Sequence, residues 1–228
     1  MNDDGSDQRQ VTFDSNEKRH LAWSPDGSSI AFDSCPTSVL RHCYVDLLAS
    51  DGRVRRVVDD PIGPVHGGLA WSPDGTLIKV HAPPSPCTPC GLAALLVIEV
   101  EGGAVVTASP GDVTSSSWSS SGAIVFDKRE GIAGDSGISV YSPSHQVNTL
   151  IDSSADESAV SWRPGSDTVA FISSQDNVHR LKTIGATGSG EQTLLEITAT
   201  EIAPYIYFPL LAGPVRWSPD GKFVAYKQ

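Results

Sequence analysis

The chain has 228 residues, enough for one all-β domain or two small ones, and a formal net charge of −11, which makes nucleic acids and anionic membranes poor partners. Its longest apolar run, residues 92–98, is far too short to span a bilayer. We therefore expect no nucleic-acid partner and no membrane insertion.

A five-residue motif, Trp-Ser-Pro-Asp-Gly, recurs along the chain. It stands intact at residues 23–27, 71–75 and 217–221, and altered copies begin at Trp118 and Trp162. The steps between the five Trp residues are 48, 47, 44 and 55 residues, a spacing typical of repeat architectures. Because Pro presets φ, Asp bonds its own backbone and Gly accepts a positive φ, the motif predicts a tight turn between two strands. We expect each Trp to pack into a core.

The predicted strands follow one another in units of four. The stretch 10–13 is expected to be the outermost strand of a unit whose earlier strands do not precede it. Four units follow, with strands at 20–23, 29–32, 43–47 and 55–58; 68–71, 77–81, 94–100 and 104–107; 115–118, 123–127, 138–141 and 147–151; and 159–162, 168–172, 180–184 and 192–195. After a long insertion at 197–213, a last unit has strands at 215–217 and 223–226. Four strands joined by tight hairpin turns form one blade of a β-propeller, so each of the four complete units corresponds to a blade. The sequence therefore predicts an all-β propeller with four complete four-stranded blades and a fifth, composite or incomplete blade closed by both termini.

This repeat, with Ile-Ala-Phe at 30–32 after the turn and Asp-Gly at 51–52 after a later strand, resembles that of the TolB-type, WD-repeat-like β-propellers. The resemblance covers nearly the whole chain and implies a single TolB-like propeller domain over residues 1–228. TolB-type propellers usually have six blades. Either the fifth blade is incomplete, or the chain is an excerpt of a longer protein.

The resemblance implies a binding platform and transfers no catalytic residue. We expect a non-enzymatic, monomeric module without a cofactor that mediates protein–protein interaction. The alternative is the accessory or gating propeller of a larger prolyl oligopeptidase-like hydrolase whose catalytic domain is absent here. The chain itself contains no Gly-x-Ser-x-Gly nucleophile segment.

The four cysteines form two close pairs, Cys35 with Cys43 and Cys87 with Cys90. Their even number and equivalent positions between second and third strands favour two disulfides. Free thiols or a four-Cys zinc site are the alternatives, since Cys87 and Cys90 have zinc-knuckle spacing. Disulfides and the family resemblance together predict a periplasmic or secreted protein, although residues 1–20 contain no signal-peptide pattern.

Two groups of residues are candidates for ligand binding. His20 and His66 lie near the start of innermost strands, where they either face the central channel or are satisfied at strand edges. The insertion at 197–213 carries Tyr205, Tyr207 and Phe208, which suit a partner-binding patch, a plug across the channel or a contact with a further blade.

Overall fold

The computed structural model describes residues 4–37, 42–83, 93–129, 136–198 and 215–226. Four antiparallel sheets of four strands follow one another in chain order, and we call them blades 1 to 4. A two-stranded sheet, the half-blade, comes last. Blade 1 contains β1 (Glu17–Trp23), β2 (Ser29–Cys35), β3 (Tyr44–Ala49) and β4 (Val54–Arg56); blade 2 contains β5 (His66–Trp71), β6 (Leu77–Ala82), β7 (Ala94–Glu99) and β8 (Val105–Ser109); blade 3 contains β9 (Ser116–Trp118), β10 (Ile124–Arg129), β11 (Ser136–Tyr141) and β12 (Val147–Asp152); blade 4 contains β13 (Asp156–Trp162), β14 (Thr168–Gln175), β15 (Val178–Gly185) and β16 (Gln192–Thr198); the half-blade contains β17 (Arg216–Trp217) and β18 (Val224–Ala225).

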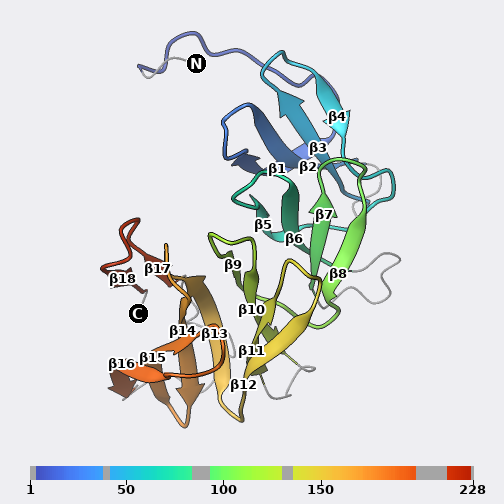
Figure 1. Ribbon diagram of the computed structural model, residues 1–228. Helices are drawn as coiled ribbons and strands as arrows, with labels where there is room; N and C mark the ends of the chain where they lie inside the picture. Colours follow the sequence, from blue (N-terminus) through green and yellow to red (C-terminus); the bar gives the residue numbers. More distant parts are fainter. Residues whose placement is uncertain (1–3, 38–41, 84–92, 130–135, 199–214, 227–228) are drawn as a thin grey trace.

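The blades are arranged along an arc, with blade 1 at one end and the half-blade at the other (Figure 1). Within each blade the strands pair in sequence order, so the first strand lies on the inner edge of the arc and the fourth on the outer edge. None of the described segments forms a helix that is long and apolar enough to cross a membrane. This arrangement confirms the predicted all-β propeller fold.

The Trp-Ser-Pro-Asp-Gly motif forms the turn that joins the first two strands of a blade. In blade 1, the hydroxyl of Ser24 donates to Oδ1 of Asp26 (2.6 Å) and accepts from the backbone N–H of Ser29 (3.0 Å). Gly27 has a φ of 71°, as the turn requires. The same contacts recur in the copies that begin at Trp71 and Trp217, so the motif acts as a repeated structural unit.

The hydrophobic core is divided among the spaces between successive blades. One buried cluster joins blades 1 and 2, a second joins blades 2 and 3, a third joins blades 3 and 4, and a fourth joins blade 4 to the half-blade. Four of the five Trp residues, all except Trp23, belong to the cluster shared with the blade that precedes their own. Trp71, for example, packs against the cluster shared by blades 1 and 2.

Three predictions about the chain ends and the Trp residues need correction. Residues 10–13 form no strand, and Phe13 is 82% exposed. In the part of the chain that the structure describes, the half-blade has two strands and no N-terminal strand joins it. Within that part the fifth blade is therefore incomplete, as one of the two alternatives predicts, and the termini do not close it. Trp23 is 66% exposed because no blade lies before blade 1 among the residues that the structure describes, whereas Trp162 is buried and the other three are half-buried.

Candidate functional site

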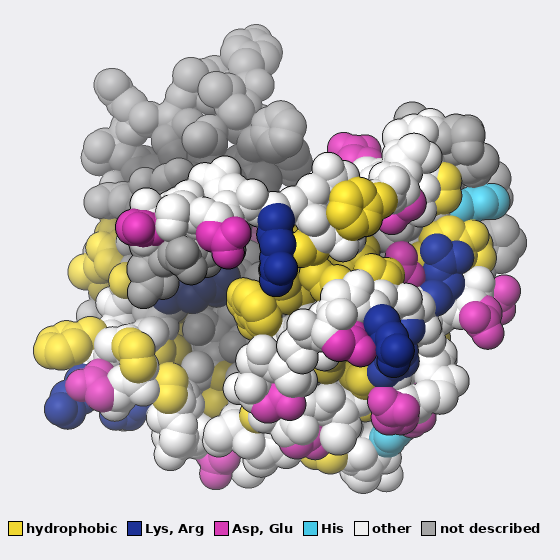
Figure 2. Space-filling model, turned by 90° about the horizontal axis from the view of Figure 1, so that it is seen from above, with side chains coloured by type: hydrophobic (Ala, Val, Ile, Leu, Met, Phe, Trp, Pro, Cys, Tyr) yellow, Lys and Arg dark blue, Asp and Glu magenta, His cyan; other side chains and the backbone are white. Residues whose placement is uncertain are grey.

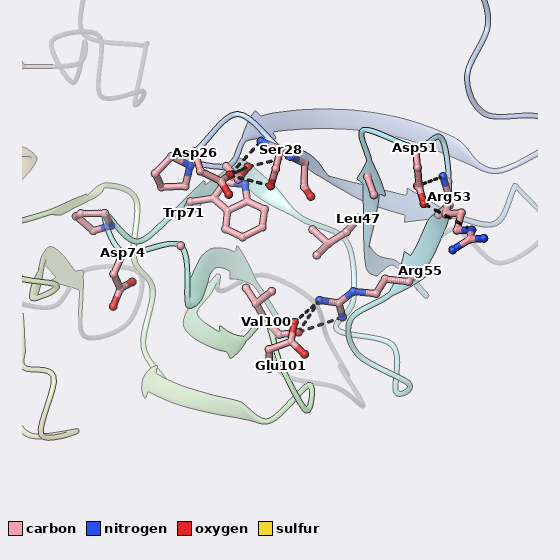
Figure 3. A pocket seen from close by; sticks show the side chains of 17 residues that line it. Asp26, Ser28, Leu47, Asp51, Arg53, Arg55, Trp71, Asp74, Val100 and Glu101 are labelled. Atoms are coloured by element: carbon pink, nitrogen blue, oxygen red, sulfur yellow. Dashed lines mark hydrogen bonds and ion pairs between the residues drawn. The ribbon is translucent and has the colours of Figure 1, made fainter.

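A groove of about 780 Å³ lies between blades 1 and 2, on the side of the Trp-Ser-Pro-Asp-Gly turns (Figure 3). Its lining combines Leu47 and the indole of Trp71 with charged side chains from both blades. Figure 3 shows Arg55 reaching from blade 1 to Val100 and Glu101 of blade 2. The groove therefore follows the seam between two blades.

The charged groups of this groove already have partners within the protein. Arg55 donates to the carbonyl of Val100 (3.1 Å) and to Glu101 (3.0 Å), and so joins the outer parts of the two blades. Asp26 and Asp74 accept hydrogen bonds from the Ser hydroxyls of their own turns. With these groups satisfied, the groove offers a ligand little unpaired charge.

A second hollow, of about 640 Å³, lies on the inner side of the arc. It is bounded by the innermost strands β5, β9 and β13, by β6 behind them, and by Arg216 of β17. β1 contacts β5 and β9 contacts β13, whereas β5 and β9 lie farther apart. The wider spacing leaves room for the hollow between blades 2 and 3.

Lys79 and His81 lie on the same side of β6, two residues apart, and both line this hollow. The ammonium of Lys79 donates to the hydroxyl (2.5 Å) and to the backbone carbonyl (3.0 Å) of Ser116 in blade 3. Nε2 of His81 lies 2.7 Å from the same hydroxyl. These contacts link the two blades through polar groups.

The surroundings keep positive charge poorly solvated at this site. Burial lowers the pKa of Lys79 to about 8, and the nearby charge of Arg216 adds to this effect. Burial, followed by the charges of Lys79 and His66, lowers the pKa of His81 to about 3, so its imidazole is neutral at pH 7. Neutral Nε2 of His81 can accept the proton of the Ser116 hydroxyl while that hydroxyl accepts from Lys79.

The cations here lack a carboxylate counterpart among the described residues. No acidic group contributes to the pKa of Lys79, and Arg216 donates a hydrogen bond to the backbone carbonyl of Val215 (3.1 Å). Acidic side chains are instead scattered over the surface seen from above (Figure 2). The hollow is thus a locally positive site on a protein of net charge −11.

The two predicted histidines occupy different environments. His20 lies on β1 with its Nδ1 3.3 Å from the buried carboxylate of Asp33, whose Oδ1 also accepts the backbone N–H of His20 (2.7 Å). His66 is exposed at the start of β5 and lies close enough to influence His81. Neither histidine lines the inner hollow; His66 directly precedes its lining residues Gly67 and Gly68, and the ring of His20 lies near Gly68.

Sequence reasoning missed Lys79, Ser116 and Arg216. A residue-by-residue comparison of the blades would have found them, because each is more polar than its counterparts in other blades.

The cysteine and aromatic candidates are only partly described. Cys35 and Cys43 form a disulfide with Cα atoms 4.2 Å apart, which closes the connection between β2 and β3. The second pair, Cys87 and Cys90, and the aromatic group, Tyr205, Tyr207 and Phe208, lie outside the described residues. Within the described ranges, no cluster of three or more His, Cys, Asp or Glu is placed to hold a metal ion.

No family model matches the sequence, and no curated protein matches it. Solved structures do match the fold. The alignment with TolB from Acinetobacter baumannii covers 97% of this chain and 51% of the TolB chain, at 17% identity and a TM-score of 0.59. The alignment with an oligogalacturonate lyase in complex with manganese covers 90% of this chain and 57% of the lyase chain, at 13% identity and a TM-score of 0.59.

The alignment with puromycin hydrolase covers 94% of this chain and 34% of the hydrolase chain, at 15% identity and a TM-score of 0.57. The chain therefore spans about half the length of the TolB structure and about a third of the hydrolase. Because all three sequence identities are low, these similarities establish the fold alone. The chain has the β-propeller fold of the TolB type.

Proposed function

We propose that this chain is a non-enzymatic binding platform that holds a segment of a protein partner in the inner hollow between blades 2 and 3. The observation that supports it most is the pair Lys79 and Arg216 lining the hollow without an acidic partner among the described residues. The groove in Figure 3 is larger, but its charges are already paired.

A location outside the cytosol accompanies this proposal. The disulfide between Cys35 and Cys43 supports it, because such bonds persist in oxidising compartments such as the periplasm and the extracellular space. The likeness to the TolB fold is compatible with the same location.

Blocking the hollow tests the binding role. Ala70 lines the hollow from β5, so Ala70→Trp should fill part of it. The matched control is Ala22→Trp, at the equivalent position of β1 and outside the lining of the hollow. The carbonyls of both alanines accept an indole N–H, and neither substitution removes that acceptor.

The measurement is capture from an envelope extract with each variant as bait, followed by identification of the retained proteins. We expect a partner that the original chain and Ala22→Trp retain and that Ala70→Trp loses, with all three proteins melting cooperatively. Equal retention by Ala70→Trp would contradict binding at the hollow.

The second reading is an accessory propeller of a larger hydrolase, which the alignment with about a third of puromycin hydrolase keeps open. A Gly-x-Ser-x-Gly segment encoded in frame beyond Gln228 would favour this second reading over an independent platform.

A further inference from the structure

Equivalent positions in the spaces between blades hold apolar pairs. In each second strand, the residue that pairs with the one directly before the Trp of the same blade occupies the equivalent position. This residue packs in one cluster with the residue two before the Trp of the next unit. Three of the four spaces have such a pair: Ala31 with Leu69, Val125 with Val160, and Ala170 with Val215. The repeat therefore provides an apolar contact at this point.

The space between blades 2 and 3 departs from this rule at both positions. Lys79 stands where the other blades have Ala31, Val125 and Ala170, which are fully buried. Ser116 stands where the other units have Leu or Val. The two polar residues contact each other directly, with the ammonium 2.5 Å from the hydroxyl.

At two further positions, blade 2 and the half-blade differ from the other blades in ways that make the same hollow more positive. His81 occupies the position of Asp33 and Asp127, so blade 2 lacks the buried carboxylate of blades 1 and 3. Arg216 stands directly before Trp217, where the other four units have Ala or Ser. Four departures from the repeat thus occur around one hollow, and together they remove an acid and add two cations.

The ammonium of Lys79 has a further N–H group with which it can bind a ligand. An ammonium has three N–H groups, and two of them point to the hydroxyl and the carbonyl of Ser116. Arg216 has five N–H groups, of which one bonds Val215. A poorly solvated charge is unfavourable unless a counter-charge pairs with it, and two neighbouring cations increase that need.

We propose that this hollow binds an oxyanion, a carboxylate or phosphate group of the ligand, held by Lys79 and Arg216. The proposal rests on the binding role proposed above, since it names the chemical group recognised at the same hollow. The Ser116 hydroxyl and the neutral His81 imidazole orient the ammonium and do not add charge.

Calorimetric titration with small probes tests the proposal. The probes are an acetylated tripeptide with a free carboxylate, the same tripeptide as its amide, and inorganic phosphate, in chloride buffer of constant ionic strength. We expect heat of binding for the free carboxylate or for phosphate and none for the amide. The stronger of the two oxyanions identifies the source of the group.

Two variants remove the site without a cavity or a strained contact. Lys79→Val with Ser116→Val restores the kind of apolar pair seen in Val125 and Val160, so it should fold. Its melting midpoint should be a few degrees lower, because Nε2 of the buried His81 loses the Ser116 hydroxyl. Arg216→Gln removes the second cation and keeps a side chain of similar length. We expect the double variant to bind the oxyanion at least tenfold more weakly and Arg216→Gln to bind it several-fold more weakly.

Lys222→Val is the matched control because this exposed lysine of the half-blade pairs with Asp220 and does not line the hollow. It should bind as the original chain does. Absence of oxyanion binding by the original chain, or equal binding by the folded double variant, would overturn the proposal. If a partner is still lost with Ala70→Trp in that case, the binding platform stands and only the oxyanion assignment fails.

Discussion

The indole Nε1 of Trp71 donates a hydrogen bond to the backbone carbonyl of Ala22, 3.0 Å away in the preceding blade. Trp118 and Trp217 make the same contact at 3.2 Å, with Ala70 and Ser161. Trp162 instead bonds Ser166 of its own turn (2.8 Å). Three of the five Trp residues thus connect one innermost strand to the one before it, and Trp23 has no preceding strand in the part of the chain that the structure describes.

This relationship predicts that equivalent Trp residues differ in their effect on stability. Trp71→Ala removes a half-buried ring and the hydrogen bond to Ala22, so we expect the free energy of unfolding to fall by about 3 kcal/mol or more. Trp23→Ala removes a ring that is 66% exposed and should cost under ~0.5 kcal/mol. Urea unfolding of both variants measures the difference, and equal losses would contradict the assignment.

Acid sensitivity should depend on the turn carboxylates. The Ser24 hydroxyl, followed by the backbone N–H of Ser28, lowers the pKa of Asp26 to about 2, and Ser hydroxyls likewise lower the pKa of Asp74 and Asp220. A pKa that is lower in the folded chain gives stability above the unfolded value of about 4, and this stability disappears as the pH falls through the folded pKa.

We therefore expect the free energy of unfolding to fall between about pH 4 and pH 2. In a variant with Asn at 26, 74 and 220, that fall should be smaller. Urea unfolding across this pH range checks the expectation, and an unchanged slope in the triple variant would show that other groups control acid sensitivity.

Much of the fold follows from local sequence signals. The Ser-Pro-Asp-Gly turns set the register of the first two strands, and apolar stretches such as residues 30–32 identify the strands themselves, so most strand positions are confirmed. The extended pattern at residues 10–13 was misleading because a strand also needs a neighbour to pair with, and no neighbour lies beside this stretch in the described chain.

The binding site was much harder to predict. Lys79 and Ser116 are 37 residues apart, and nothing local shows that they meet. Their contact follows from the packing of blade 2 against blade 3, which places equivalent strand positions opposite each other. The exposure of Trp23 has a similar origin, since burial of each Trp depends on the blade before it and not on its own motif.

The buried carboxylate of Asp127 should be important for blade 3. It accepts the backbone N–H groups of Thr114 (2.7 Å) and Ser115 (2.9 Å) and both of their hydroxyls. Burial raises the pKa of Asp127, while these donors act in the opposite direction. Asp127→Asn introduces an amide N–H₂ among four donors, so we expect a loss of about 2–3 kcal/mol.

The control for Asp127→Asn is Asp152→Asn, at an exposed position on β12, which should change the free energy of unfolding by under ~0.5 kcal/mol. Similar stabilities of the two variants would mean that the network around Asp127 contributes little.

The disulfide should stabilise blade 1 by limiting the unfolded chain. Cys35 and Cys43 are separated by eight positions, and closing so short a loop contributes about 2–3 kcal/mol on chain-entropy grounds. Replacing both residues with Ala should lower the free energy of unfolding by about this amount. Peptide mapping without reductant should show the 35–43 link and, as we also expect, an 87–90 link. Four titratable thiols in the denatured protein would contradict both links.

The most direct measurement of the central claim is the pKa of Lys79 by NMR of the protein with labelled lysine side chains. The variant Lys79→Val with Ser116→Val assigns the resonance by its disappearance. A half-buried cation that has no acidic partner among the described residues should titrate at a pKa of about 8 in the free protein, and a bound oxyanion should raise that pKa. A pKa near the ordinary lysine value of about 10.4, unchanged by carboxylate or phosphate, would contradict the account.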